Sequence, residues 1–553
     1  MNTPTPALVT QRAARGMPRL ALLLLCAAYV LPGVFARDPW RNADITAFGY
    51  MLSLAEGRSP WLSPSLGGIA ADAALLPYWL GAISIKLWSP WLDAALAARL
   101  PFGALLALTL ALTWYSAYQL ARTDAAQPVA FAFGGEAEPV DYARAIADAA
   151  VLALIASLGL LQLGHETTPE IAQLFGVSLY LWSLAAAPFR RWRARLGAVA
   201  ALTILAGSGA PFVALAIGTV GSVLLWRSTY AQVRGMAAWT VIGTLLSALM
   251  AWALHLWHWW VDFDFDASQL LQIGRLWLWF TWPAWLLALW TLWRWRRHLQ
   301  HRHVSVPLMI VAVALLCSFG MGGSDRALML GLPPLAVLAA FALPTLNRST
   351  TAGIDWFSMI LFTLLAGALW VIYLSVQFGV PVRPAANVQK LAPGFTPQFS
   401  ALPLLIALAA TACWIWLVRW RTGRHREALW KSLVLPAGGV ALCWLLLMTL
   451  GLQIVDYARS NRPLAQRLAR HIPKNECISA AGQPLSMIAA LEFYGRYRVD
   501  ARHDAVTTTC NYLIRTQAVG STQPPPEGWR LVARERRPTD RNNLTSVYQR
   551  TAP

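Results

Sequence analysis

The chain has 553 residues, of which 57% are hydrophobic and only 13% charged, and its mean hydropathy is +0.47. This balance excludes an ordinary soluble protein, because apolar runs near the roughly 20 residues that a bilayer requires recur along the sequence. The formal charge of +19 does not indicate nucleic-acid binding, because the basic residues cluster in short loops between apolar runs. We therefore predict a polytopic protein whose partners include membrane lipids and no nucleic acid.

The first apolar run, residues 18–36, follows a short N-terminal segment that contains arginines and no acid. Lys and Arg stay preferentially on the cytoplasmic side of a membrane, so we expect a cytoplasmic N-terminus. No small-residue cleavage site follows the run, which favours an anchor over a removed signal peptide. Asp44 then lies on the outer face.

The next apolar run, residues 73–88, is short and contains Pro77 and Lys86. If this run crossed the membrane, every later basic loop would fall outside; if it lies in the outer interface, those loops fall inside. We favour the interfacial position, since basic loops prefer the cytoplasm. The first outer loop is then residues 37–97.

About 13 spans are expected in total. An odd number of spans exports the C-terminus, and the division at "GSGAP" (207–211) supplies the odd count. The predicted spans are residues 18–36, 98–121, 145–163, 170–188, 196–208, 209–226, 237–258, 274–294, 305–320, 327–345, 354–378, 400–418 and 430–453.

The composition changes after the last span, so we divide the chain into a membrane domain, 1–453, and a soluble periplasmic domain, 454–553. Charged residues and alternating patterns predict a small α/β fold in the second domain. Cys477 and Cys510 are its two cysteines. An oxidising compartment favours a disulfide between them over two unpaired thiols.

A second group of outer polar residues follows the third span, in "LQLGHETTPEI" (161–171), which contains His165, Glu166 and Glu170. Such acids are often solvated loop groups, and Glu170 is also placed to favour the dipole of the next helix. Their position on the same face as Asp44 suggests a shared site instead.

A third polar group, "HLWHWWVDFDFD" (255–266), could hold a divalent metal through His255, His258, Asp262 and Asp264. The two histidines are three residues apart, which is not a recognised full ligand set, and an acidic helix exit explains the aspartates. We favour the loop interpretation. A divalent metal is the one cofactor that the sequence suggests.

The order of these features resembles the GT-C membrane glycosyltransferases, in particular the branch of bacterial aminoarabinose transferases and protein O-mannosyltransferases. The resemblance implies an all-α polytopic membrane domain of GT-C type followed by a small α/β periplasmic domain. It rests on the outer acids and on "PYWL" (77–80), "ARLPFGALLALTLAL" (98–112), "SDRALMLGLPPLAVLAA" (324–340) and "DYARSNRPLAQRL" (456–468).

The resemblance further implies a polyprenyl phosphate sugar as donor, with outer acids that bind or deprotonate the acceptor. Asp44 is then the expected base or orienting group, and Glu166 the second acid. This assignment agrees with the chemistry, because sugar transfer needs an acid to take the hydroxyl proton and cations to hold the leaving phosphate.

Arg326 and Arg275 are the expected phosphate ligands on the outer side; snorkelling at the interface is the alternative for both. The sequence departs from the family at Met329 and Leu330, where a tyrosine is usual. It also lacks the lysine that aminoarabinose transferases carry before the aromatic residues of the first loop. Lys86 or Arg58 is expected to compensate.

We therefore expect an inverting glycosyltransferase of the bacterial inner membrane that acts on the periplasmic face. Its acceptor is a lipid A-like or other envelope glycolipid, or a protein. The alternatives are a transporter or flippase and an inactive relative that binds polyprenyl phosphate. A transporter would place ionisable groups near the midplane, whereas the acids here gather at one face.

Overall fold

The computed structural model describes residues 5–71, 74–228, 230–257, 266–423, 428–521 and 524–551. The chain divides into two compact units. Unit 1 consists of Met1–Gly33, Phe102–Gly367 and Leu405–Leu446, and unit 2 consists of Val34–Pro101, Ala368–Leu404 and Leu447–Pro553.

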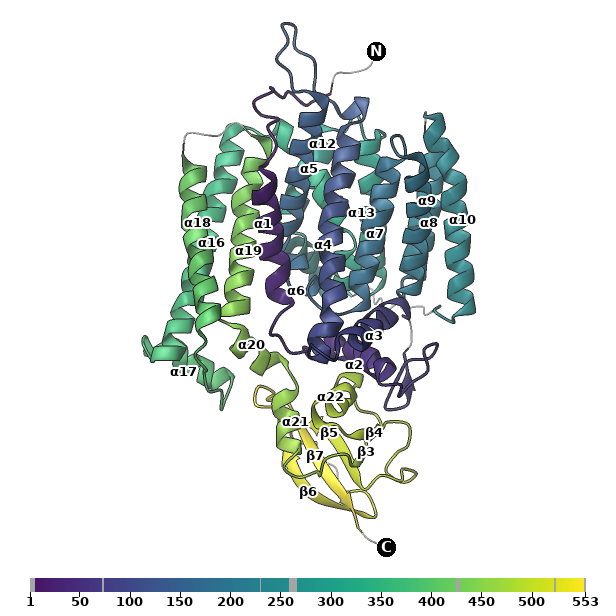
Figure 1. Cartoon of the computed structure of the whole chain (residues 1–553), viewed down its shortest axis with the longest axis vertical. Helices are drawn as coiled ribbons and strands as arrows, with labels where there is room; N and C mark the ends of the chain where they lie inside the picture. Colours follow the sequence, from purple (N-terminus) through teal and green to yellow (C-terminus); the bar gives the residue numbers. More distant parts are fainter. Residues whose placement is uncertain are drawn as a thin grey trace. The chain divides into compact units, whose positions relative to one another are not determined.

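Unit 1 is a helical bundle built from the long apolar runs. Figure 1 shows α8, α9 and α10 side by side, and each of these helices contacts the other two. Helices wholly within the unit are α1 (Arg19–Val30), α5 (Pro139–Ala156), α6 (Leu158–Leu163), α7 (Pro169–Ala186), α8 (Arg191–Gly207), α9 (Pro211–Trp226), α10 (Ala231–Ala253), α11 (Ala267–Phe280), α12 (Ala284–Arg294), α13 (Arg302–Gly320), α14 (Asp325–Met329) and α15 (Leu332–Ala340).

The core of unit 1 lies around α5 and α15, which pack against each other. Every residue of α15 is buried, as is nearly the whole of α5. Four further helices run from one unit into the other along the chain: α4 (Ala94–Ala121), α16 (Arg348–Phe378), α18 (Ala401–Thr422) and α19 (Val434–Thr449).

Within the described residues, seven helical segments are long and apolar enough to cross a membrane. The chain is therefore a multi-pass membrane protein. The other predicted spans coincide with shorter helices, and the division at "GSGAP" is confirmed by the separate helices α8 and α9. The seven segments are Ala94–Ala121, Ala231–Ala253, Arg302–Gly320, Asp325–Thr345, Arg348–Phe378, Ala401–Thr422 and Leu429–Thr449.

Several predicted spans are not continuous helices; among them are the runs 145–163 and 274–294. The run 145–163 breaks at Ser157, whose extended backbone separates α5 from α6. The run 274–294 breaks between α11 and α12 at Pro283, because proline has no N–H and disfavours helix at the residue before it. The two breaks meet, since the Leu158 N–H donates to the Trp282 carbonyl oxygen at 3.0 Å.

Unit 2 contains two packed helices of the first loop, α2 (Ala43–Ala55) and α3 (Leu76–Trp88), and the hairpin β1 (Ser65–Leu66) and β2 (Ile69–Ala70). The expected interfacial run at 73–88 thus ends in a 13-residue helix. Further helices of this unit are α17 (Val382–Leu391), α20 (Leu452–Arg459), α21 (Arg462–Leu468) and α22 (Leu485–Gly495).

The predicted C-terminal α/β fold is confirmed, with a five-stranded sheet in the order β4-β3-β5-β7-β6 (Figure 1). β3 lies parallel to β4 and β5, whereas β7 lies antiparallel to β5 and β6. A disulfide joins Cys477 to Cys510, whose Cα atoms are 4.8 Å apart. The strands are β3 (Cys477–Ser479), β4 (Arg498–Asp500), β5 (Tyr512–Ala518), β6 (Trp529–Glu535) and β7 (Asn543–Arg550).

Candidate functional site

Asp44 lies in the first turn of α2, where its carboxylate is 1% exposed and pairs with the equally buried Arg37. Arg37 Nη1 donates to Asp44 Oδ2 at 2.7 Å, and the backbone N–H of Trp40 donates to the same oxygen at 2.9 Å. The Arg37 guanidinium also lies 4.5 Å from the centre of the Trp40 ring. The cation compensates for the loss of water around the carboxylate, so Asp44 is held as an oriented, paired acid.

Arg99, at the start of α4, is a buried cation that the sequence analysis did not select. Its Nη1 donates to the Val34 carbonyl oxygen at 3.2 Å, whereas its Nη2 is buried without a hydrogen-bond partner among the described residues. An arginine inside an apolar run is a signal that the sequence does offer, since intramembrane charges are rare and usually functional.

The segment before α2 is fixed by α20 and α21 of the C-terminal region. Trp40 Nε1 donates to Asp456 Oδ1 at 2.8 Å, and Arg462 holds Asp38 with two hydrogen bonds of 2.9 and 2.5 Å. Burial raises the pKa of Asp456 from 3.8 to about 6. These contacts give the stretch 456–468 a structural role, because it holds the segment that leads into α2, where Asp44 lies.

Glu166 lies in unit 1, in the loop between α6 and α7, and is joined to Arg326 at the start of α14. Arg326 Nη2 donates to Glu166 Oε2 at 2.6 Å. Arg326 Nη1 donates at 3.1 Å both to Glu170 and to the hydroxyl of Thr168. The structure therefore brings together three of the residues that the sequence analysis discussed, and one guanidinium serves two carboxylates.

His165 anchors the same loop. Its Nδ1 lies 2.7 Å from the carbonyl oxygen of Leu161, and its Nε2 lies 2.9 Å from the carbonyl oxygen of Tyr29 in α1. Carbonyl oxygens only accept, so both contacts are hydrogen bonds only when the ring carries both protons. The ring of Trp444 lies 4.6 Å away. The His165 side chain thus ties the Glu166 loop to α1.

Comparison with known proteins shows which solved structures share the fold of this chain. No protein-family model and no curated protein matches the sequence. The structure is similar to that of ArnT from Cupriavidus metallidurans bound to undecaprenyl phosphate, with a TM-score of 0.61 and 13% identity over 96% of this chain and 98% of that chain. The apo state of ArnT gives a TM-score of 0.62 and 13% identity over 95% and 97%.

The chain has the fold of ArnT. The architecture that the resemblance implied, a polytopic helical domain of GT-C type with a small C-terminal α/β domain, is confirmed as a fold. At 13% identity, the likeness to ArnT establishes the fold alone.

Within the ArnT-like fold, the remaining expected phosphate ligands are more exposed. Arg275 lies on an exposed face of α11. Lys86 is exposed on α3, with its Nζ 5.2 Å from the centre of the Trp61 ring. Arg58 pairs with Glu56 at 2.6 Å and also with Glu492. Arg58 therefore already has two anionic partners, whereas Lys86 has a cation–π contact only among the described residues.

The suggested metal site lies largely outside the described part of the ArnT-like fold. His258, Asp262 and Asp264 are not among the described residues, and His255 is exposed with a φ of 52°. Among the residues that the structure does describe, no group of three or more His, Cys, Asp or Glu side chains is suited to hold a metal ion.

Asp148 in α5 is a buried acid that the sequence analysis missed within a predicted span. Its two carboxylate oxygens accept hydrogen bonds from Trp114 Nε1 and from the backbone N–H of Met17, each at 2.7 Å. Both oxygens are used to fasten the N-terminal segment and α4 to α5. In the ArnT-like fold, Asp148 thus has a structural explanation.

Proposed function

We propose that the chain is an inverting glycosyltransferase that transfers a sugar from a polyprenyl phosphate to an acceptor at the periplasmic face of the bacterial inner membrane. The acceptor is an envelope lipid of the lipid A type, another envelope glycolipid, or a protein. The observation that carries the proposal is the shared fold with ArnT, which has been crystallised with undecaprenyl phosphate, over 96% of this chain.

Asp44 is proposed as the base or orienting group. Transfer with inversion requires the acceptor oxygen to attack the sugar C1 while the bond from C1 to the phosphate oxygen breaks. A carboxylate that takes the hydroxyl proton in this step assists by hydrogen bonding and by proton transfer. The Arg37 contact at 2.7 Å supports the orienting role, because a charge-assisted hydrogen bond restricts how the carboxylate can turn.

Glu166 is proposed as the second acid, and Arg326 as a ligand of the donor phosphate. A guanidinium has five N–H donors, and the described contacts of Arg326 with Glu166, Glu170 and Thr168 use three. The side chain of Arg326 is 24% exposed, so it retains both donors and access for an anion. Its ion pairs would fix the guanidinium before a phosphate arrives.

Arg99, Arg275, Lys86 and Arg58 are the other proposed sources of positive charge for the departing phosphate. The unsatisfied Nη2 of Arg99 is the strongest support among them, since a buried donor without a partner costs free energy unless an anion uses it. The exposed Arg275 and Lys86 offer charge without fixed orientation.

The competing transporter function is less well supported by these clusters. The predicted spans contain few Asp or Glu residues, and the acids concentrate in the loops between them. A transporter would be expected to place such groups on broken helices near the midplane. An inactive polyprenyl-phosphate-binding relative would retain Arg326 but need no base.

The test is transfer by the purified chain from defined polyprenyl phosphate sugars to lipid A-type and peptide acceptors, with NMR of the anomeric configuration of the product. An inverted product supports the proposal. Binding of the donor without transfer to either class of acceptor would favour the inactive relative. Mass spectrometry of envelope lipids and glycoproteins from a deletion strain then identifies the acceptor.

The proposed orientation has its own test with reporter fusions. Fusions after residues 192 and 298 should report a cytoplasmic position, and a fusion after residue 460 a periplasmic one. A cytoplasmic signal after residue 460 would overturn the interfacial position of residues 73–88 and the proposed side of the site.

A further inference from the structure

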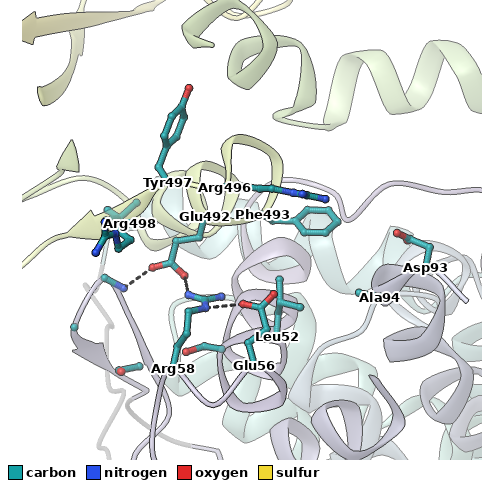
Figure 2. Close-up of a pocket in the computed structure, with 15 residues that line it drawn as sticks. Leu52, Glu56, Arg58, Asp93, Ala94, Glu492, Phe493, Arg496, Tyr497 and Arg498 are labelled. Carbon is teal, nitrogen blue, oxygen red and sulfur yellow. Dashed lines mark hydrogen bonds and ion pairs between the residues drawn. The ribbon is translucent and has the colours of Figure 1, made fainter. Parts of the chain in front are cut away.

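Unit 2 contains a cavity of about 670 Å³, a volume that suits a small ligand. Its walls come from the end of α2 and the loop that follows, from the start of α4, and from the corner between α22 and β4 (Figure 2). The lining is mixed: Leu52, Phe493 and Val499 supply apolar surface, whereas the Ser65 hydroxyl and several charged side chains supply polar surface.

One of the cationic side chains in the cavity is already neutralised. Figure 2 shows the Arg58 guanidinium between Glu56 and Glu492. Glu492 is 7% exposed and also accepts a hydrogen bond of 3.0 Å from the Gly67 backbone N–H. This group closes one wall of the cavity and fixes the loop from α2 against α22.

Two other guanidinium groups remain available. Arg496 and Arg498 line the cavity and are exposed, and neither forms an ion pair with the described residues. They flank Tyr497, which is 4% exposed and whose hydroxyl donates to the Ile472 carbonyl oxygen at 3.1 Å. The buried tyrosine therefore fixes the backbone from which both arginines project.

The backbone at this corner is also unusual. Arg496 has a φ of 54°, in the left-handed region that disfavours residues with a Cβ, and it forms the C-cap of α22. Glycine would satisfy this cap with less strain. The remaining acid of the lining, Asp93, accepts a hydrogen bond from the Ala95 backbone N–H at 3.1 Å and so caps α4.

We propose that this cavity binds an anionic saccharide, whose phosphate or carboxylate is held by Arg496 or by Arg498, which project to opposite sides of the corner (Figure 2), while its hydroxyl groups meet the polar part of the walls. Guanidinium groups bind both kinds of oxyanion through paired, charge-assisted hydrogen bonds. The assignment of this saccharide as the head group of the acceptor rests on the proposed function; the binding itself does not.

The experiment measures binding to the purified full chain in detergent, with N-acetylglucosamine 1-phosphate, glucuronate and N-acetylglucosamine as probes. The unmodified chain should bind one or both anions at least about ten times more tightly than the neutral sugar, as expected for charge-assisted hydrogen bonds. Binding of only the phosphate identifies a phosphorylated saccharide. Equal binding of all three probes would overturn the proposal.

The decisive variant is Arg496→Gln/Arg498→Gln, which should weaken anion binding at least about tenfold. Arg470→Gln/Arg530→Gln is the matched control, because it removes the same charge from exposed positions outside the cavity lining. Anion binding that survives in the first variant, or falls equally in both, contradicts the proposal. If the first variant does not fold, Arg498→Gln alone serves, since strand β4 is held by backbone contacts.

Failure of this inference and failure of the proposed function can be told apart. The release of polyprenyl phosphate by slow hydrolysis of the donor needs no acceptor and should be unchanged in Arg496→Gln/Arg498→Gln. If the chain binds the anions specifically but transfers no sugar, the cavity is a binding site and the proposed glycosyltransferase activity is wrong. If the chain transfers sugar and Arg496→Gln/Arg498→Gln leaves the KM for the acceptor unchanged, the cavity is not the acceptor site.

Discussion

Gly33 leaves the space in which the imidazole of His165 lies. A Cβ at residue 33 would overlap with the Cδ2 atom of that ring. The two residues are far apart in sequence, yet their contact determines how closely the end of α1 approaches the loop that carries Glu166. Glycine is required here because of this close approach, and its φ is not in the left-handed region.

We predict that Gly33→Ala lowers stability by roughly 1–3 kcal/mol, the range for overpacking a buried site. Thermal unfolding of the purified chain measures the effect. Gly320→Ala is the control, since a Cβ at residue 320 meets no atom within 4 Å. Equal unfolding temperatures for the two variants would show that His165 moves aside without cost.

Asp44→Asn should reduce sugar transfer at least about 100-fold, the lower range for loss of general-base assistance. Removal of one partner of a buried ion pair also destabilises a protein, by about 3–5 kcal/mol. Arg37→Gln is therefore the control, because it breaks the same pair and keeps the carboxylate. Comparable turnover by the two folded variants would assign Asp44 a structural role.

Arg326→Ala should raise the KM for the polyprenyl phosphate donor at least about tenfold, the loss expected for one charge-assisted hydrogen bond. Arg326→Lys should recover only part of this loss, because an ammonium group cannot reproduce the paired geometry of a guanidinium. Arg348→Ala, at an exposed position that begins α16, should leave the KM unchanged. If Arg326→Ala has an unchanged KM for the donor, Arg326 does not bind the phosphate and only holds Glu166 and Glu170 in place.

Asp456 should make stability depend on pH. Its pKa is about 6 in the folded chain and 3.8 as its ordinary value, so the folded state binds the proton more tightly. The resulting stabilisation is complete below about pH 4 and is lost as the pH rises through 6; it amounts to at most about 3 kcal/mol. Unfolding of Asp456→Asn should show a smaller decline between pH 4 and 6, and an unchanged decline would contradict this assignment.

Cys477 and Cys510 should resist a thiol reagent until the protein is reduced, because the disulfide occupies both sulfur atoms. Mass spectrometry of alkylated peptides, prepared with and without prior reduction, measures this protection. The reduced sample is the internal control for reagent access, because both thiols are then available to the reagent. Labelling of both tail cysteines without reduction would show that the bond is absent.

Most helices could be predicted because an apolar run of sufficient length must be helical in a bilayer. The breaks were harder to see. Pro283 is a visible signal, but Ser157 fits a helix in sequence. At the break, its neighbour Leu158 donates its backbone N–H to the distant Trp282 carbonyl oxygen. Local pattern cannot reveal a hydrogen bond between residues so far apart.

The candidate acids were visible in the sequence, whereas their partners were not. Asp44 and Glu166 stand out as carboxylates beside apolar runs, but Arg326 lies 160 residues after Glu166 in the chain. Arg37 lies only seven residues before Asp44, yet nothing in the sequence shows that its side chain is buried. Such pairs depend on tertiary packing, as does the free Nη2 of Arg99.

The contacts of Asp38 and Trp40 bear on how the chain can be cut. Both residues obtain their partners from Asp456 and Arg462, so a truncation after residue 453 removes the groups that hold the loop before α2. Without these contacts the loop before α2 is no longer held in place, and the orientation of Asp44 at the start of α2 is less well fixed. Grafting the C-terminal region of a relative onto this chain should fail for the same reason, unless the graft brings an acid and an arginine to these two places.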